Sequence, residues 1–361
     1  MLRRLIQATA PRNDEKFFDM RYSCYLLLAI FLCGCATITG PAVSNEEINQ
    51  AREELKVKAL KFQIDYLVRV NNVGYRLLKH LPEESRKGHY VSSGLLLAQG
   101  DKYFKQIYNL QEGRGIVVLG VVDGSPAKEA GIQAGDFIQK VDGINVKELS
   151  DIAYIFNHKG PGNAVELAAS RAASPMNFNF RLADKPVDVS FRMVDEQEVN
   201  AGATSDVVVV TYGLMRFIKN DNEAAVILGH ELAHVVRNHH VKASGVNLIS
   251  ALISIAAGIG ANYVVPGAGD VLVQSLTQAL SASYSQDLER EADYFGLRYV
   301  YLAGYDIEAG VDVWERFAVE IPQSMTRNYF STHPSSPERM LRVKKIIQEL
   351  RASSPIGSTH L

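Results

Sequence analysis

Cysteine is nearly absent from this sequence of 361 residues. All three cysteines lie in the first tenth of the chain, so no disulfide can form within the remainder. Excess charge of one sign is also lacking. The formal net charge of -2 gives no electrostatic reason to expect nucleic acid as a partner. The 47% hydrophobic and 22% charged residues are typical of globular proteins, and a chain of this length is expected to form more than one domain.

The N-terminal region lacks an apolar run long enough to cross a bilayer. Residues 25–32 are apolar, but they have only the length of the hydrophobic part of a secretory signal. They end in Leu32-Cys33-Gly34-Cys35, which resembles the processing box of bacterial lipoproteins. Because small residues precede Cys35, it is the predicted lipid-bearing residue. Residues 1–34 are thus a predicted signal peptide with Met20 favoured as its true start, and an uncleaved anchor is the alternative.

The lipoprotein resemblance implies a location. Lipid on Cys35 would anchor the mature chain in a membrane of the bacterial cell envelope, on the periplasmic side. Ala36 rather than aspartate follows Cys35, and this favours the outer membrane in a Gram-negative cell.

The pattern of apolar residues divides the rest of the chain into helical and strand-rich parts. Residues 35–85 repeat apolar positions at three- and four-residue steps and are expected to be helical. Residues 90–183 alternate short strands with turns. Residues 184–350 begin with strands and continue as helices, and residues 351–361 are expected to be a mobile tail. The predicted fold class is α+β: a mainly helical domain with a small sheet, interrupted by an inserted β-rich domain.

The inserted segment carries motifs of a peptide-binding domain. Residues 124–127, 130–132 and 141–143 resemble a PDZ domain of the bacterial envelope-protease type. The resemblance implies that C-terminal peptides bind by strand addition, with backbone amides holding the terminal carboxylate. The loop supplying these amides is placed at Gly94-Leu95-Leu96-Leu97, which lacks the second glycine of the family pattern. A small β-domain used only as a spacer is the alternative.

Two histidines at helical spacing predict a zinc site. Asn220-Asp221-Asn222-Glu223 is a capping box ahead of an apolar-periodic run, so a helix is expected over residues 222–241. His230 and His234 then lie one turn apart on one face, as two zinc ligands require. Glu231 lies beside them and is the predicted general base for the attacking water. Two surface histidines without a metal are the alternative.

A catalytic zinc needs a third protein ligand. His240 has the spacing that metzincins use, but those enzymes need a glycine at the position of Arg237 to turn the chain back. The helix is therefore expected to continue, which carries His240 about 9 Å beyond His234 along the axis. His239 is excluded by the same argument.

Carboxylates on a second predicted helix offer a better ligand. Glu289 and Asp293 lie one turn apart on the same face, so Glu289 is the predicted third ligand. Asp293 is expected to orient a ligand histidine. Glu291 points to another side of the helix and is expected to form an ion pair.

These motifs together resemble the HtpX-like zinc metallopeptidases. The resemblance rests on residues 230–234, on Glu289-x-x-Ala-Asp293, and on matches at residues 66–78 and 332–339. It implies one zinc per chain and a zinc-dependent endopeptidase that cleaves unfolded or misassembled envelope proteins. A strand near residues 207–211 is expected to be an edge that holds substrate backbone.

Some alternatives stay open. His333 is the candidate donor to the developing oxyanion, although it would equally suit the position before a capped helix. Residues 245–265 are apolar and either cover the active site or contact a membrane. The rival function is a non-catalytic lipoprotein that binds unfolded C-termini and holds a structural zinc. An intact Glu231 argues against this rival, because a structural zinc site has no use for that carboxylate.

Overall fold

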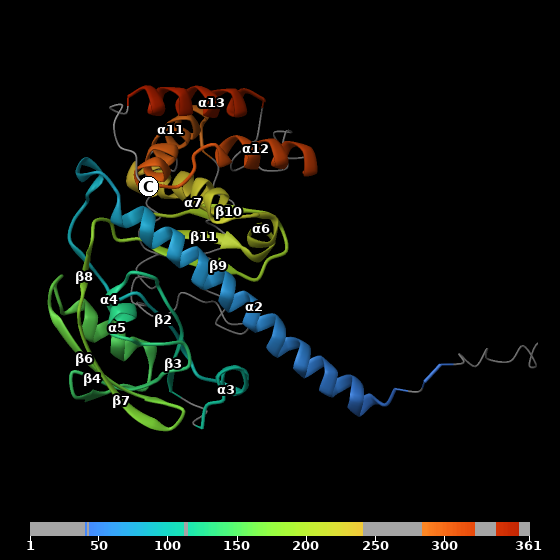
Figure 1. The fold of residues 1–361 in the computed structure, drawn as a ribbon, viewed down its shortest axis with the longest axis vertical. Coiled ribbons are helices and arrows are strands. Elements are labelled where there is room, and N and C mark those ends of the chain that lie inside the picture. Colours follow the sequence, from blue (N-terminus) through green and yellow to red (C-terminus); the bar gives the residue numbers. More distant parts are fainter. Residues whose placement is uncertain (1–39, 42, 112–114, 241–283, 322–336, 354–361) are drawn as a thin grey trace, which may run out of the picture. The chain divides into compact units, whose positions relative to one another are not determined.

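The computed structural model describes residues 40–41, 43–111, 115–240, 284–321 and 337–353 (Figure 1). The chain divides into two units, residues 1–52 and 53–361. In the first unit, helix α2 (Asn45–Lys79) begins after Ser44. The Glu47 amide donates to Ser44 Oγ at 3.2 Å, and the Ser44 amide donates to the Glu47 carboxylate at 2.7 Å. This reciprocal capping fixes the start of the helix.

A small sheet lies beside the helices of the C-terminal part. Its strand order is β10 (Ala201–Ala203), β11 (Val207–Thr211), β9 (Ser190–Val194). β11 pairs antiparallel with β10 and parallel with β9. The expectation that residues 207–211 form an edge is therefore wrong. The unbroken Val-Val-Val-Val-Thr run is buried throughout, as suits a central strand covered on both faces.

Helices complete this part of the fold. Figure 1 shows α7, α11, α12 and α13 gathered together next to β10. Contacts between α7 and β10, and between α11 and both α7 and α13, hold the group together. Their bounds are α6 (Tyr212–Phe217), α7 (Asp221–Val236), α11 (Gln286–Leu302), α12 (Ala309–Glu320) and α13 (Pro337–Ala352).

Helix α7 starts as expected but ends early. The Asn220 side chain accepts the Glu223 amide at 3.0 Å, which caps the first turn. The helix stops at Val236, because Asn238 adopts a left-handed conformation with φ of 57°. The expected continuation to residue 241 is therefore wrong. Asparagine tolerates this conformation better than most residues, and the sequence argument took only glycine into account.

The inserted domain has its own sheet and core. The chain enters through β1 (Tyr90–Ser92) and leaves through β8 (Ala183–Lys185), and these strands pair antiparallel, so both connections lie side by side. The six-stranded sheet runs β2 (Leu95–Gln99), β3 (Ile116–Val121), β4 (Phe137–Val141), β6 (Ala164–Arg171), β7 (Ser174–Arg181), with β5 (Ile144–Asn145) on β4. Its helices are α3 (Lys102–Tyr108), α4 (Pro126–Glu129) and α5 (Leu149–Asn157), and a short 3₁₀ helix, Glu83–Ser85, precedes the domain. The α+β prediction is confirmed.

Strand β2 is buried on both faces. Leu95 and Leu97 point into the core of the inserted domain. Leu96 and Ala98 belong instead to the core that contains Leu67 and the other apolar residues of α2. The apolar run Leu95–Ala98, which lacks the alternation of a half-exposed strand, follows from burial on two sides.

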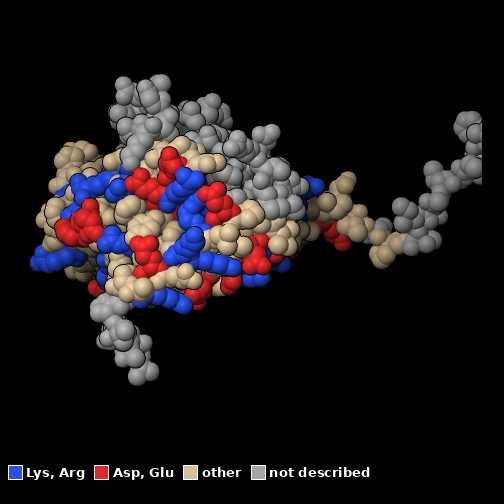
Figure 2. Space-filling model, turned by 90° about the horizontal axis from the view of Figure 1, so that it is seen from above, with Lys and Arg blue, Asp and Glu red and all other residues tan. Residues whose placement is uncertain are grey.

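The described surface carries mixed charge. Figure 2 shows basic and acidic side chains interspersed over the face in view. Among the helices that the structure describes, none has the length and apolarity needed to cross a membrane. The predicted signal peptide with Cys35, the apolar residues 245–265 and His333 lie outside the described residues.

Candidate metal centre

Three buried side chains meet where α7 packs against α11. His230 and His234 come from α7, and Glu289 comes from the first turn of α11. The two Nε2 atoms lie 3.2 Å apart, and each lies 3.4 Å from a Glu289 carboxylate oxygen. One ligand atom from each residue lies within 4.8 Å of the others. Two imidazoles and one carboxylate are a donor set of catalytic zinc sites, so these residues fit the metal.

A contact between two glycines sets the distance between these helices. A Cβ atom added to Gly296 of α11 would lie 2.8 Å from both the N and the Cα of His230. A Cβ atom on Gly229 of α7 would lie 2.9 Å from the Gly296 carbonyl oxygen. Because neither residue has a side chain, the helix backbones touch at this point. The contact brings the histidine-bearing and carboxylate-bearing faces within reach of one ion.

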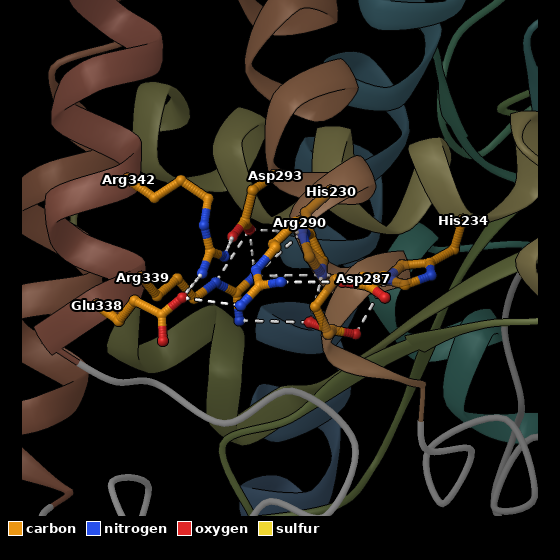
Figure 3. A network of polar contacts seen from close by, with 9 residues as sticks. His230, His234, Asp287, Arg290, Asp293, Glu338, Arg339 and Arg342 are labelled. Carbon is orange, nitrogen blue, oxygen red and sulfur yellow. Dashed lines mark hydrogen bonds and ion pairs between the residues drawn. The ribbon is translucent and has the colours of Figure 1, made fainter.

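A network of ion pairs holds His230 from behind (Figure 3). Its Nδ1 atom lies 3.1 Å from Asp293 Oδ1. Arg339 of α13 donates to Asp293 through Nε at 3.0 Å and Nη2 at 2.7 Å, and Arg342 donates at 3.2 Å. The Arg339 guanidinium also stacks over the Trp314 ring, 3.7 Å from its centroid. Asp293 thus lies where the sequence placed a carboxylate that orients a ligand.

These contacts control the ionisation of the metal-free site. Burial alone would raise the pKa of Asp293. The positive charges of Arg339 and His230 lower this pKa by more, so it lies below the usual value. Burial and Arg339 lower the pKa of His230, whereas Asp293 and Glu289 raise it, and the balance is a pKa of about 9. His230 therefore carries a proton at neutral pH when the site holds no metal. Zinc must displace this proton to bind.

Glu231, the predicted general base, is buried beside the same ligand group. It is buried on the α7 turn that carries both histidines. Burial raises the pKa of the nearby Tyr284, and the negative charges of Glu231 and Glu289 raise it further. Both carboxylates therefore act on the Tyr284 hydroxyl, and this hydroxyl stays protonated.

Sequence reasoning missed Tyr284 and the role of Arg339. The Tyr284 ring stacks on His234, with centroids 3.9 Å apart, and its hydroxyl donates to the Ala203 carbonyl of β10 at 3.2 Å. No local pattern marks this tyrosine, because it precedes α11 and reaches its partners only through the fold. Arg339 lies within residues 332–339, one of the segments that resemble the HtpX-like metallopeptidases. This resemblance was the available sign in the sequence that Arg339 has a role.

The two histidines after α7 stand outside the ligand group found among the described residues. His240 is half-buried, and burial lowers its pKa. His239 is fully buried, with its Nδ1 atom 2.9 Å from His234 Nδ1. The sequence argument excluded both as ligands because it expected a continuing helix. The observed reason is the turn at Asn238, which directs His239 to the back of His234 rather than to the metal position.

The predicted peptide-binding loop lines a cavity of about 290 Å³. Gly94, Leu95 and Leu96 contribute to its wall, whereas Leu97 is buried in the domain core. Gly94 has φ of +80°, and an added Cβ would lie 2.0 Å from Ser125 Oγ. Phe156 and Asn157 of α5 line another side, and Tyr75 of α2 and Phe191 of β9 line a third, so the cavity lies between the inserted domain and these two elements.

Comparisons with known proteins match both parts of the chain. The profile of peptidase family M48 matches residues 165–347, and a PDZ profile matches residues 117–164. The metalloprotease YcaL of Escherichia coli is 30% identical over 43% of this chain and 61% of its own length. The mitochondrial metalloendopeptidase OMA1 of Arabidopsis thaliana is 32% identical over 41% of this chain and 29% of its own. The beta-barrel assembly-enhancing protease of E. coli is 24% identical over 45% and 35%.

The alignments with these curated relatives span less than two thirds of the relatives' own length. Among solved structures, the PDZ domain of HtrA3 bound to a phage-derived ligand matches 27% of this chain and 88% of its own. The identity is 22% and the TM-score is 0.24. The M48 match begins inside β6, whereas the structure places β6 and β7 in the sheet of the inserted domain.

The glycine contact generates a prediction. Gly296→Ala places a methyl group against the His230 backbone, so the helices must move apart. We expect a stability loss of about 1–3 kcal/mol and zinc affinity reduced by at least roughly tenfold. Denaturant unfolding and chelator competition measure the two effects. Gly160→Ala, where an added Cβ meets open space, is the matched control. Parent-like zinc affinity in Gly296→Ala would contradict the proposed spacing.

Proposed function

This chain belongs to peptidase family M48, and we propose that it is a zinc-dependent endopeptidase of the bacterial cell envelope that cleaves unfolded or misassembled proteins. The observation that carries the proposal is the buried cluster of His230, His234 and Glu289 with Glu231 on the same helix turn. The inserted PDZ domain and the family resemblance support the substrate class. The names of the related metalloproteases are consistent with it.

The chemistry follows from the side chains around the cluster. When bound, zinc polarises the scissile carbonyl and makes a water more acidic. Glu231 takes the proton of the attacking water and passes it to the leaving amine. Asp293 holds His230 in the orientation that presents Nε2, because it accepts the Nδ1 proton. We propose His333, which lies outside the described residues, as a donor to the developing oxyanion.

The sheet offers a place for the substrate backbone. Among the described strands, β10 pairs with β11 alone, and α7 packs next to it. Tyr284 connects Ala203 of β10 to the ring of His234. An extended substrate that adds to β10 would therefore lie beside the metal ligands. Recognition through backbone hydrogen bonds selects for extended chains rather than for particular side chains, as unfolded proteins require.

We propose that the PDZ domain recruits C-terminal peptides of such substrates. The cavity at Gly94 and Leu95 adjoins both α5 and β2, which is an edge strand among the described strands. Lipid at Cys35 would keep the enzyme on the periplasmic side of a membrane, with the outer membrane favoured in a Gram-negative cell. This location would place it near unfolded envelope proteins.

Replacement of the general base separates catalysis from metal binding. We expect Glu231→Gln to retain about one zinc per chain and to cleave casein at least ~100-fold more slowly, because the attacking water loses its proton acceptor. Metal analysis and a casein assay with the lipid-free protein measure both. The exposed Glu315→Gln of α12 is the control. Cleavage by Glu231→Gln at the parent rate would contradict the proposed mechanism and would favour the rival function as a non-catalytic binding protein.

The loop glycine tests peptide recruitment. Gly94→Ala cannot keep φ of +80° without strain, and its methyl group strikes Ser125. We expect the affinity for a labelled hydrophobic C-terminal peptide to fall at least roughly tenfold, measured by fluorescence anisotropy. The same peptide with an amidated C-terminus should bind the parent protein as weakly as the free peptide binds Gly94→Ala. Equal binding of the free and amidated peptides would exclude carboxylate recognition.

The lipid attachment makes a prediction about processing. Cys35→Ser should accumulate as an unprocessed precursor in a bacterial host, because the acceptor thiol is gone. Cys33→Ser should be processed normally, since residue 33 is not the acceptor. Mass spectrometry of the mature N-terminus decides the matter. An unmodified residue there in the parent protein would refute the anchor.

A further inference from the structure

His239 occupies an unusual position behind a zinc ligand. Its side chain is 0% exposed, and its Nδ1 atom lies 2.9 Å from His234 Nδ1. On its other side, its Nε2 atom lies 3.4 Å from a carboxylate oxygen of Glu291 on α11. The second Glu291 oxygen accepts from Arg237 Nε. His234, His239 and Glu291 thus form a continuous chain of contacts that runs from the metal position, through two buried rings, to a partly exposed carboxylate.

The turn after α7 places His239 there. Asn238, with φ of 57°, interrupts the helical path two residues after α7 ends at Val236. Lys87 Nζ donates to the Val235 carbonyl at 2.9 Å and also to Asn238 Oδ1, so it braces the turn from outside. A continuing helix would carry the next residues away from His234. The turn instead places His239 next to His234 Nδ1, on the side of the imidazole opposite to the Nε2 atom that faces Glu289.

The proton positions along the chain follow from zinc ligation. His234 Nε2 faces Glu289 and must be free of a proton to bind zinc, so the His234 proton lies on Nδ1. Two nitrogens 2.9 Å apart form a hydrogen bond only if one of them donates. His239 Nδ1 must therefore accept, and the His239 proton then lies on Nε2, where it faces the Glu291 carboxylate. This arrangement of protons satisfies both of these contacts.

We propose that His239 is a positioning residue for the zinc site: it accepts the Nδ1 proton of His234, and Glu291 fixes His239 in the tautomer that can accept. The inference rests on the zinc site itself and not on the identity of the substrate. His230 is held differently, since a carboxylate, Asp293, contacts it directly. The two zinc-binding histidines thus have a charged and a neutral partner.

Charge explains why an imidazole stands at this position. The site already buries the carboxylates of Glu231, Glu289 and Asp293. A further carboxylate in direct contact with His234 would add another anion to a region of low dielectric, where unpaired charge is costly. The His239 ring supplies the acceptor without a charge. It moves the anion, Glu291, outward to a position where Arg237 pairs with it.

Two substitutions at position 239 separate positioning from packing. Asparagine places Oδ1 near the position of the imidazole Nδ1 and keeps an acceptor, whereas leucine fills the space without one. We expect His239→Leu to bind zinc about 10–100-fold more weakly than the parent, the usual cost of losing such a partner. His239→Asn should stay within about threefold of the parent. Zinc dissociation constants come from competition with a chromophoric chelator, without any substrate.

Controls keep the outcomes distinct. His240→Leu replaces the half-buried neighbouring imidazole and should leave zinc affinity unchanged. Thermal unfolding of the metal-free variants reports packing, and His239→Leu should match His239→Asn there. If the two variants lose zinc affinity equally, or if neither loses any, His239 acts only as a packed core residue and the proposal fails. Because no peptide is cleaved in these measurements, failure of the proposed function would leave their result intact.

Discussion

The contact between Gly229 and Gly296 is the constraint on which the zinc site depends. Helices with ordinary side chains at the crossing pack with their axes 8–10 Å apart, and bare glycines permit the closest approach. Here the backbone of His230 itself lies against Gly296. Zinc ligands must lie about 2 Å from the metal, so the two helices have little freedom to move apart before one ligand is lost. A local steric feature with no chemistry of its own therefore determines whether His230, His234 and Glu289 can share an ion.

Such close packing forces charged groups together in a buried space, and the fold balances them. Arg339 contacts Asp293 and lies 3.7 Å from a Glu289 oxygen, while its flat face rests on Trp314. A buried ion pair contributes little net stability, but removal of one partner typically costs about 3–5 kcal/mol. The same arginine lowers the pKa of Asp293, so this carboxylate stays ionised behind His230. The balance serves the metal more than the stability of the fold.

Much of the centre could be predicted because it depends on local periodicity. The one-turn spacings of His230 with His234 and of Glu289 with Asp293 put each pair on one helix face, whatever the rest of the chain does. Contacts between distant segments could not be read in this way. The central position of β11 depends on which strands pair, and the placement of Tyr284 depends on the fold around it. The early end of α7 depended on Asn238 taking a conformation that asparagine adopts only in some contexts.

The connection to the inserted domain is tied to the same region. Lys87 precedes β1, and its backbone amide donates to the Pro186 carbonyl just after β8, so it lies where the chain enters and leaves that domain. Its side chain donates to Val235 and Asn238 at the end of α7. Burial lowers the pKa of this lysine, which reflects a cation partly withdrawn from water. Hydrogen bonds from a charged donor contribute roughly 1.5–3 kcal/mol each. A displacement of this connection that breaks them would also release the turn that holds His239 behind His234, so the junction of the PDZ domain and the geometry of the zinc ligand share one anchor.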